Sequence, residues 1–274
     1  MHLGKAAPAV RIRLGSLEPR TITEDFCRRA AALPNLCPQF HLSLQSGCDA
    51  TLKRMNRKYD TTRYAQSVAL LNQYFEHPAV TTDLITGFPE ETEEEFSQTL
   101  DFLRRCGFAQ MHIFPYSIRP GTPAANMRQV PKAVKEERAH RAAEVAAELH
   151  RKYLADCVGA VYPVLFEQPR DGKYAGHAPN YMEVLADGAD LHNEIWNVKI
   201  TGTDGESLLG EILEDCVGAV YPVLFEQPRD GRYVGHAPNY MEVLAEGADL
   251  HNQIRNVKIT GTDGESLLGE VLED

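Results

Sequence analysis

The most regular pattern of apolar and polar positions lies in residues 82–107 and predicts a strand, a turn and a helix. Thr92, followed three positions later by Glu95, is the pattern of a capping box that begins a helix. Gly107 comes where a helix C-terminus favours a residue with positive φ. The helix between them would turn one apolar stripe toward a core, made of Phe96, Leu100 and Leu103.

Similar units surround this one. Strands are expected at 10–16, 39–44, 83–86 and 111–116, with helices at 23–33 and after a cap at Thr61 or Thr62. In the second of these strands, one face would carry Phe40, Leu42 and Leu44 and the other His41, Ser43 and Gln45. Alternating strands and helices favour a parallel sheet with right-handed crossovers, in which the loops after the strands carry ligands. Asp83, inside a strand, would need a charged partner, for which Arg11 or Arg13 is the candidate.

A long helix is expected from Pro131, with proline at its first position and an apolar stripe of Ala142, Val145, Leu149 and Tyr153. From residue 156 onward the pattern changes to short β-like runs separated by glycine-rich turns, which predict a small all-β barrel or sandwich. Residues 215–273 then repeat residues 156–214 with six differences. These are Lys173/Arg232, Ala175/Val234, Asp187/Glu246, Glu194/Gln253, Trp196/Arg255 and Ile212/Val271.

Composition and charge narrow the function classes. No apolar run is long enough to span a membrane, no secretory leader is recognisable, and the six cysteines form no CxxC or CxxxCxxC group, so a cytoplasmic protein is expected. The net charge of −11 is unevenly distributed. Residues 1–155 carry 21 Lys and Arg against 17 Asp and Glu, whereas both repeats are strongly acidic. A nucleic-acid partner would therefore prefer the first part of the chain.

Several strings in one order resemble the radical S-adenosylmethionine methylthiotransferases. They are RLGSLEP, HLSLQSGCDATLKRMNRKY, TTDLITGFPEETEEEF, HIFPYSIRPGTPAA and QVPKAVKEER, and the repeated unit with LFE, GHAPNYMEV and DLHN resembles the RNA-binding TRAM domain that ends these enzymes. The resemblance implies an α/β fold with a partial parallel (β/α) barrel at 1–130, a connecting helix at 131–155, and two small all-β barrels at 156–214 and 215–274. It implies an enzyme that adds a methylthio group to the adenine 2-position of N6-threonylcarbamoyladenosine, beside the tRNA anticodon.

The resemblance also implies cofactors, namely S-adenosylmethionine and [4Fe–4S] clusters. The family holds its radical-generating cluster with a CxxxCxxC loop and an auxiliary cluster with a further domain, and neither sequence feature occurs here. We therefore expect no catalysis from this chain alone. A non-catalytic RNA-binding protein and a different radical enzyme remain alternatives, and a strand edge along 10–16 is expected to favour self-association.

Particular residues follow from the resemblance. The cofactor candidates are Ser43, Gln45, Arg57, Gly87 and Phe114, and the RNA candidates are Arg119, Asn180, Tyr181, Asn239 and Tyr240. Each has a plainer alternative: turn geometry for Gly87, core packing for Phe114 and Tyr116, and a solvated surface for Arg57 and Arg119. Two departures fall in the central loop, where Glu90 stands in place of the second glycine of the family's usual GFPGET and Thr86 in place of a usual valine.

Overall fold

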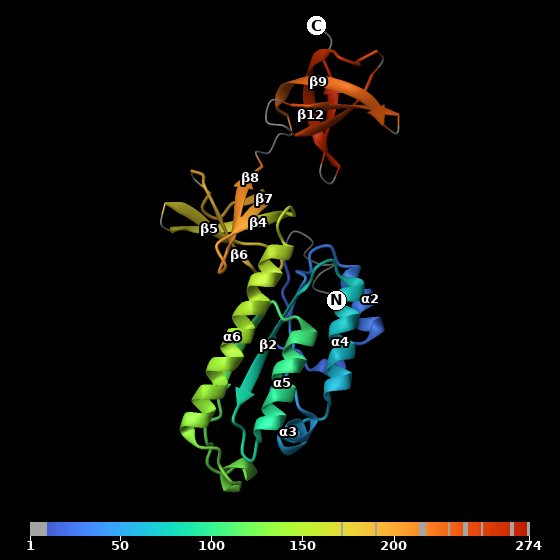
Figure 1. Cartoon of the computed structure of the whole chain (residues 1–274). Coiled ribbons are helices and arrows are strands. Elements are labelled where there is room, and N and C mark those ends of the chain that lie inside the picture. Colours follow the sequence, from blue (N-terminus) through green and yellow to red (C-terminus); the bar gives the residue numbers. More distant parts are fainter. Residues whose placement is uncertain are drawn as a thin grey trace.

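The computed structural model of the protein describes residues 10–170, 172–189, 191–213, 218–229, 231–237, 241–247, 249–263 and 266–272. An α/β unit, which we call the body (residues 10–156), is followed by two β-barrels that lie one beyond the other (Figure 1). The helices of the body are α2 (Glu24–Ala31), α3 (Asp49–Arg54), α4 (Thr61–Tyr74), α5 (Glu93–Cys106) and α6 (Lys132–Asp156), with short 3-10 turns η1 (Pro19–Thr21) and η2 (Pro123–Asn126).

The body is built on a parallel sheet of three strands in the order β1 (Gln39–His41), β2 (Ala79–Thr86) and β3 (Gln110–Pro115). Helices α4, α5 and α6 form a layer in front of β2 (Figure 1). The side chains that β1 and its continuation turn toward this layer are fully buried, namely Phe40, Leu42 and Leu44. Alternation along the strands leaves the opposite face uncovered by these helices, and we call it the open face. The mixed α/β fold class expected from the sequence is confirmed.

Local signals set the helix ends. Thr92 and Glu95 form both hydrogen bonds of the capping box, and Gly107 ends α5 with φ of 66°. Two expected starts were off by one residue. Asp60, rather than Thr61 or Thr62, caps α4 by accepting from the Arg63 amide at 2.7 Å. Pro131 is the N-cap of α6 rather than its first helical residue.

The strand expected at 10–16 is wrong. This segment makes only isolated parallel bridges, from Ile12 to Leu36 and from Leu17 to Leu42. Its backbone pairs with the chain before β1 and again just after β1, and residues 13–16 between these two bridges join no ladder. Because the Leu17 amide donates to the His41 carbonyl at 2.8 Å, this segment covers part of the β1 edge instead of presenting a strand edge of its own.

Each repeat folds into a closed five-stranded barrel. The first has the order β4-β5-β6-β8-β7 and the second β10-β11-β13-β12-β9. The strands are β4 (Val161–Arg170), β5 (Lys173–His177), β6 (Glu183–Ala186), β7 (Ile195–Thr203), β8 (Leu208–Ile212), β9 (Val220–Arg229), β10 (Arg232–His236), β11 (Glu242–Glu246), β12 (Ile254–Asp263) and β13 (Ser266–Val271). Closure leaves no free sheet edge, which stabilises such small units against strand-to-strand association.

The first barrel shares a core with the body. Tyr153, Leu154 and Cys157 at the end of α6 cluster with Ala79, Ala109 and the barrel interior. The Tyr153 hydroxyl donates to the His77 carbonyl at 3.0 Å, and its ring stacks on the His77 ring at 4.4 Å. Within the described ranges, no helix is both long and apolar enough to cross a membrane.

Candidate functional site

A row of polar side chains crosses the open face of the parallel sheet. His41 on β1 contacts two residues of β2: its Nδ1 lies 3.1 Å from the Thr81 hydroxyl, and its Nε2 lies 3.3 Å from the Asp83 carboxylate. His112 on β3 pairs in register with Asp83, and its ring centroid lies 6.4 Å from that of His41. Three strands therefore contribute to one row of polar side chains, in which hydrogen bonds join β1 to β2 and His112 lies beside them on β3.

The partner expected for Asp83 was wrong. Asp83 pairs with His41 and not with Arg11 or Arg13, because these arginines extend away from the sheet toward the first barrel. The Arg11 guanidinium donates to the Pro163 carbonyl at 2.5 Å.

Ser43 and Gln45 follow β1 at the carboxyl end of the open face, and both are half-buried. Gln45 has φ of 70°, in the left-handed region, and its backbone exchanges hydrogen bonds with Asp83 and Ile85 of β2. The Tyr59 hydroxyl donates to the Ser43 carbonyl at 2.7 Å, and this hydrogen bond helps to hold the segment in place. Burial raises the pKa of Tyr59 to about 12, and the nearby charge of Arg57 acts in the opposite direction.

The remaining cofactor candidates are placed differently. The Arg57 side chain is exposed on the turn after α3. Phe114 lies on the open face of β3 and is 51% exposed, so its plainer assignment to the core is wrong. Tyr116, by contrast, is covered by the edge of Phe88, with ring centroids 5.1 Å apart, and by the Lys135 ammonium 4.9 Å from its ring. Arg119 is exposed on the loop that follows β3.

Gly87 is buried, and α6 fills the space beside it. A Cβ at this position would lie 2.4 Å from Cγ of Lys135, and φ is 67°. The Gly87 amide donates to the Glu91 carboxylate at 2.8 Å, so it is already satisfied within the protein. The close approach that glycine permits at position 87 is therefore an approach to Lys135 of α6.

Glu91 and Arg138 fix this loop, and the sequence analysis did not single out either one. Their side chains are only 1% and 5% exposed, and Nη1 of Arg138 donates to the Glu91 carboxylate at 2.9 Å and to its carbonyl at 3.0 Å. Burial raises the pKa of the Glu91 carboxyl, while the Gly87 amide and Arg138 both lower it. A buried pair of this kind is costly to break, because either partner alone would leave an uncompensated charge. The sequence signal that could have identified this pair is a glutamate in the turn together with an arginine on the otherwise apolar stripe of α6.

Glu90 adopts φ of 66°, a conformation that costs a side-chain-bearing residue free energy and that glycine adopts readily. Its amide donates to the Arg128 carbonyl at 3.1 Å. The backbone at position 90 therefore has the left-handed conformation that glycine adopts readily, and the family that the sequence resembles has glycine at this position.

In the first barrel, Asn180 and Tyr181 are adjacent but differ in exposure. Asn180 is 1% exposed, and its amide nitrogen donates to the Tyr153 hydroxyl at 3.2 Å. It is therefore not placed to contact RNA, and this expectation is withdrawn because burial and internal hydrogen bonds occupy the side chain. Tyr181 is 43% exposed. Asn239 and Tyr240, the matching pair in the second repeat, lie outside the described residues.

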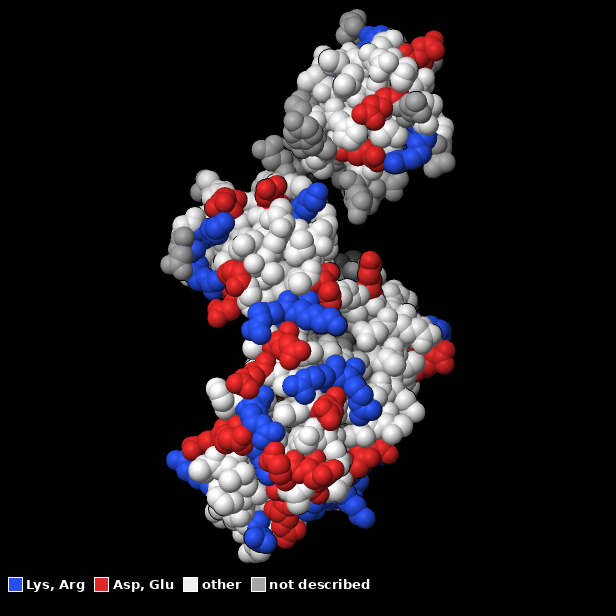
Figure 2. Space-filling view, viewed as in Figure 1, with Lys and Arg blue, Asp and Glu red and all other residues white. Residues whose placement is uncertain are grey.

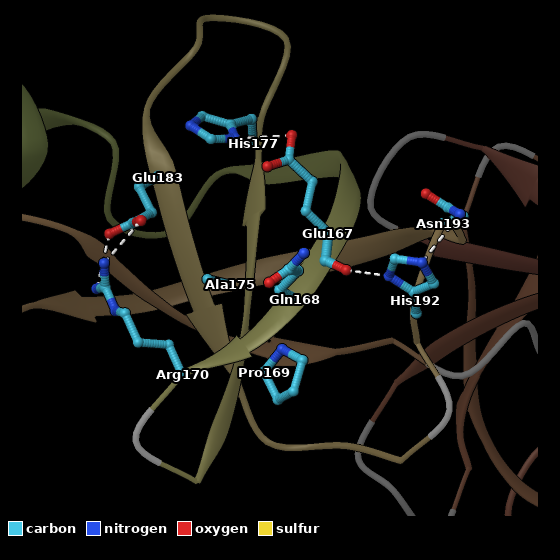
Figure 3. Close-up of a pocket in the computed structure, with 9 residues that line it drawn as sticks. All are labelled: Glu167, Gln168, Pro169, Arg170, Ala175, His177, Glu183, His192 and Asn193. Carbon is cyan, nitrogen blue, oxygen red and sulfur yellow. Dashed lines mark hydrogen bonds and ion pairs between the residues drawn. The ribbon is translucent and has the colours of Figure 1, made fainter.

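A groove of about 560 Å³ lies on the outside of the first barrel (Figure 3), and one of its lining residues, His177, stacks on Tyr181. In it His177 lies 3.3 Å from the Glu167 carboxylate, and Arg170 lies 2.8 Å from that of Glu183. The His192 ring contacts the Glu167 carbonyl (Figure 3). Its charged groups are thus paired with one another, and the groove is polar and wide open rather than a closed cavity.

The cysteines that the structure describes are dispersed. Cys27, Cys37, Cys48 and Cys157 are buried and Cys106 is partly buried, all as separate free thiols. No group of three or more His, Cys, Asp or Glu side chains among the described residues is arranged to hold a metal ion. These residues therefore do not fit an iron–sulfur cluster.

Comparisons with known proteins show what the chain is similar to. Residues 5–103 match the model of the radical SAM superfamily. The chain is 36% identical over 217 residues to the tRNA-2-methylthio-N(6)-dimethylallyladenosine synthase of Chloroflexus aurantiacus, a match that covers 77% of this chain and 47% of that protein. It is 36% identical over 197 residues to the threonylcarbamoyladenosine tRNA methylthiotransferase MtaB of Bacillus subtilis, covering 69% and 44%. It is 42% identical over 211 residues to the tRNA-2-methylthio-N(6)-dimethylallyladenosine synthase of Streptomyces coelicolor. This match covers 73% of this chain and 42% of that protein.

Residues 5–103 thus carry a radical SAM superfamily match, and most of the chain is similar to tRNA methylthiotransferases, which confirms the resemblance found in the sequence. The chain spans less than half the length of these curated relatives.

Proposed function

We propose that this chain functions in tRNA methylthiolation, with N6-threonylcarbamoyladenosine as the modified nucleoside. The body would bind the adenosyl part of S-adenosylmethionine, and the barrels, as TRAM-like domains, would contact tRNA. The observation that carries the proposal is the open face, where polar side chains of three parallel strands and an exposed ring meet in a chain related to methylthiotransferases.

The proposed cofactor site extends from the polar row to the carboxyl end of the sheet. Phe114 would stack on the adenine, since an aromatic ring left half-exposed at a strand end offers a flat apolar contact. Ser43 and Gln45 would hydrogen-bond the ribose and the methionyl part, and Arg57 would approach its carboxylate. Glu91 and Arg138 would act indirectly, by holding the loop beside the site. When bound, S-adenosylmethionine would supply the adenosyl and methyl groups of the reaction.

We further propose that these 274 residues alone do not carry out the radical step, because their sequence contains no CxxxCxxC group and the described cysteines are dispersed. The chain would then contribute cofactor and RNA contacts to an activity whose cluster is held elsewhere. The same observation favours the alternative, an RNA-binding protein without cofactor chemistry.

Calorimetric titration of the full chain with S-adenosylmethionine tests the proposal. We expect saturable binding that Phe114→Ala weakens by roughly tenfold, the effect of losing about 1–1.5 kcal/mol of aromatic contact. Ile118→Ala is the matched control, since Ile118 is also 51% exposed and lies on the following loop. Absence of binding, or equal effects of the two variants, would contradict the cofactor site and favour the RNA-binding alternative.

The nucleoside is tested by expressing the chain in a bacterial strain that lacks its own methylthiotransferases, either alone or together with a polypeptide that holds a radical-generating cluster, and analysing tRNA nucleosides by mass spectrometry. We expect a methylthio group on threonylcarbamoyladenosine only when the two polypeptides are expressed together. Modification of dimethylallyladenosine instead would overturn the substrate assignment but not the family.

A further inference from the structure

An exposed tyrosine ring at the boundary between the body and the first barrel has both of its faces covered. The guanidinium carbon of Arg13 lies 3.2 Å from the centroid of the Tyr181 ring. The His177 ring stacks on the same ring at 4.6 Å, with an interplanar angle of 20°. Because two groups cannot occupy one face at these distances, the arginine and the histidine lie on opposite faces.

The two covers are held very differently. His177 belongs to strand β5 of the same barrel and is paired with Glu167 at 3.3 Å. Arg13 comes from the body on an exposed side chain, and no hydrogen bond or ion pair of its guanidinium is seen within the part of the chain that the structure describes. A cation held over an aromatic ring at a solvated site is weakly bound. The arginine is therefore the cover that can exchange.

The backbone of Tyr181 is held in an unfavourable conformation that presents this ring. Its φ is 66°, in the left-handed region. The turn is fixed by the Tyr181 amide, which donates to the Ala178 carbonyl at 2.9 Å, and by the buried Asn180 side chain, which accepts from the Met182 amide at 3.2 Å. Backbone strain that the surroundings maintain is a mark of functional positions. The buried Asn180 thus positions its exposed neighbour.

Charge explains why such a contact would be shared between two units. Residues 156–214 carry 3 Lys and Arg against 11 Asp and Glu, so the first barrel alone repels a phosphate backbone. The body supplies cations at the boundary, and basic side chains also lie directly beneath the first barrel on the face shown in Figure 2. An aromatic platform from the barrel combined with an arginine from the body has the two parts used to bind single-stranded nucleic acid.

We propose that Tyr181 and Arg13 form a composite contact for single-stranded RNA, in which an unstacked base takes the ring face that Arg13 covers. The displaced guanidinium then pairs with a phosphate of the same strand. This inference rests on the proposed tRNA role and specifies where and how the RNA is held. Without RNA, Arg13 shields the ring; with RNA, it becomes a phosphate ligand.

The test is fluorescence anisotropy of a labelled single-stranded RNA of about ten nucleotides, within the range that one small β-barrel site covers. The full-length chain is used at several salt concentrations. We expect Tyr181→Leu to lower the affinity roughly 5- to 150-fold with little change in salt dependence, and Tyr181→Phe to bind as the wild type does. The fluorescence of Trp196, the single tryptophan, reports whether the first barrel is folded in each variant.

Two substitutions of Arg13 separate its roles. Arg13→Ala should reduce the steepness of log affinity against log salt by about 0.7, the value for one phosphate contact on a single strand. Arg13→Lys keeps the charge but loses the planar stack, so it should keep the slope and raise the affinity, because the base no longer competes with a guanidinium. Arg20→Ala, which removes another exposed arginine of the body, should leave the slope unchanged.

The outcomes distinguish this contact from the wider proposal. Wild-type binding that neither Tyr181→Leu nor Arg13→Ala changes would overturn the composite contact while leaving the RNA-binding role intact. No binding by the wild type would overturn both. Tyr240→Leu is the matched control in the second repeat, and a loss equal to that of Tyr181→Leu would show that Arg13 is not required.

Discussion

Two glycines of the body have nearly equal φ angles but different surroundings. Comparing their alanine variants measures the free-energy cost of a steric clash beside Gly87. Gly87 and Gly107 have φ of 67° and 66°. A Cβ at Gly87 would meet Lys135, with Cγ at 2.4 Å, Cβ at 3.1 Å and Cα at 3.2 Å, whereas nothing lies within 4 Å of one at Gly107. Replacing both by alanine therefore applies the same backbone cost with and without a steric clash.

The expected magnitudes differ clearly. Gly107→Ala should cost about 1 kcal/mol, because the left-handed conformation is unfavourable for alanine and the reduced freedom of the unfolded chain offsets part of that cost. Gly87→Ala carries the same cost plus that of overpacking, which is typically 1–3 kcal/mol, for a total of about 2–4 kcal/mol. Lys135→Ala removes the atom nearest to the new methyl group, so the double variant should recover part of the loss.

Urea unfolding followed by far-UV circular dichroism is the assay, since the helices described in the structure all belong to the body. Equal losses for the two alanine variants would refute the steric argument. The requirement for glycine at position 87 would then have to come from something other than Lys135, and a bound ligand would be the first candidate.

Three further outcomes follow from the structure. Glu90→Gly should raise the stability of the body by about 0.5–1 kcal/mol in the same urea assay, because glycine adopts φ of 66° without strain; a loss would contradict this. Arg54 holds the pKa of Glu95 below its ordinary 4.5, so the pair stabilises the body above that pH and its contribution is lost as the pH falls further; an acid titration of Glu95→Gln should therefore be less steep than that of the wild type. Arg255→Trp should stabilise the second barrel by about 1–3 kcal/mol in thermal unfolding, because Trp196 packs against the core of the first barrel at the matching position; an unchanged or lower melting temperature would refute this.

Local sequence determined much of the secondary structure and the fold class. The start and end of α5 follow from Thr92, Glu95 and Gly107, since capping groups act within one helical turn. The repeats predicted two β-rich units, and alternation of strands and helices predicted a parallel sheet. The segment 10–16 was assigned to a strand wrongly, because its alternation of side chains was present but the continuous pairing partner was not. A strand depends on a neighbour that local pattern cannot identify.

The site depended on tertiary structure. His41, Asp83 and His112 are far apart in the sequence, and only the register of three strands brings them into one row. The sequence by itself showed that Gly87 needs an unusual backbone, but the neighbour that demands it, Lys135, comes from a helix that begins some way further along the chain. Likewise the sequence identified Tyr181 as an aromatic contact. The arginine over its ring, Arg13, comes from the first residues of the body, far from Tyr181 in the sequence. Short-range hydrogen bonding and side-chain periodicity depend on residues that are close in the sequence. Packing and electrostatic pairing join positions that meet only after the chain has folded.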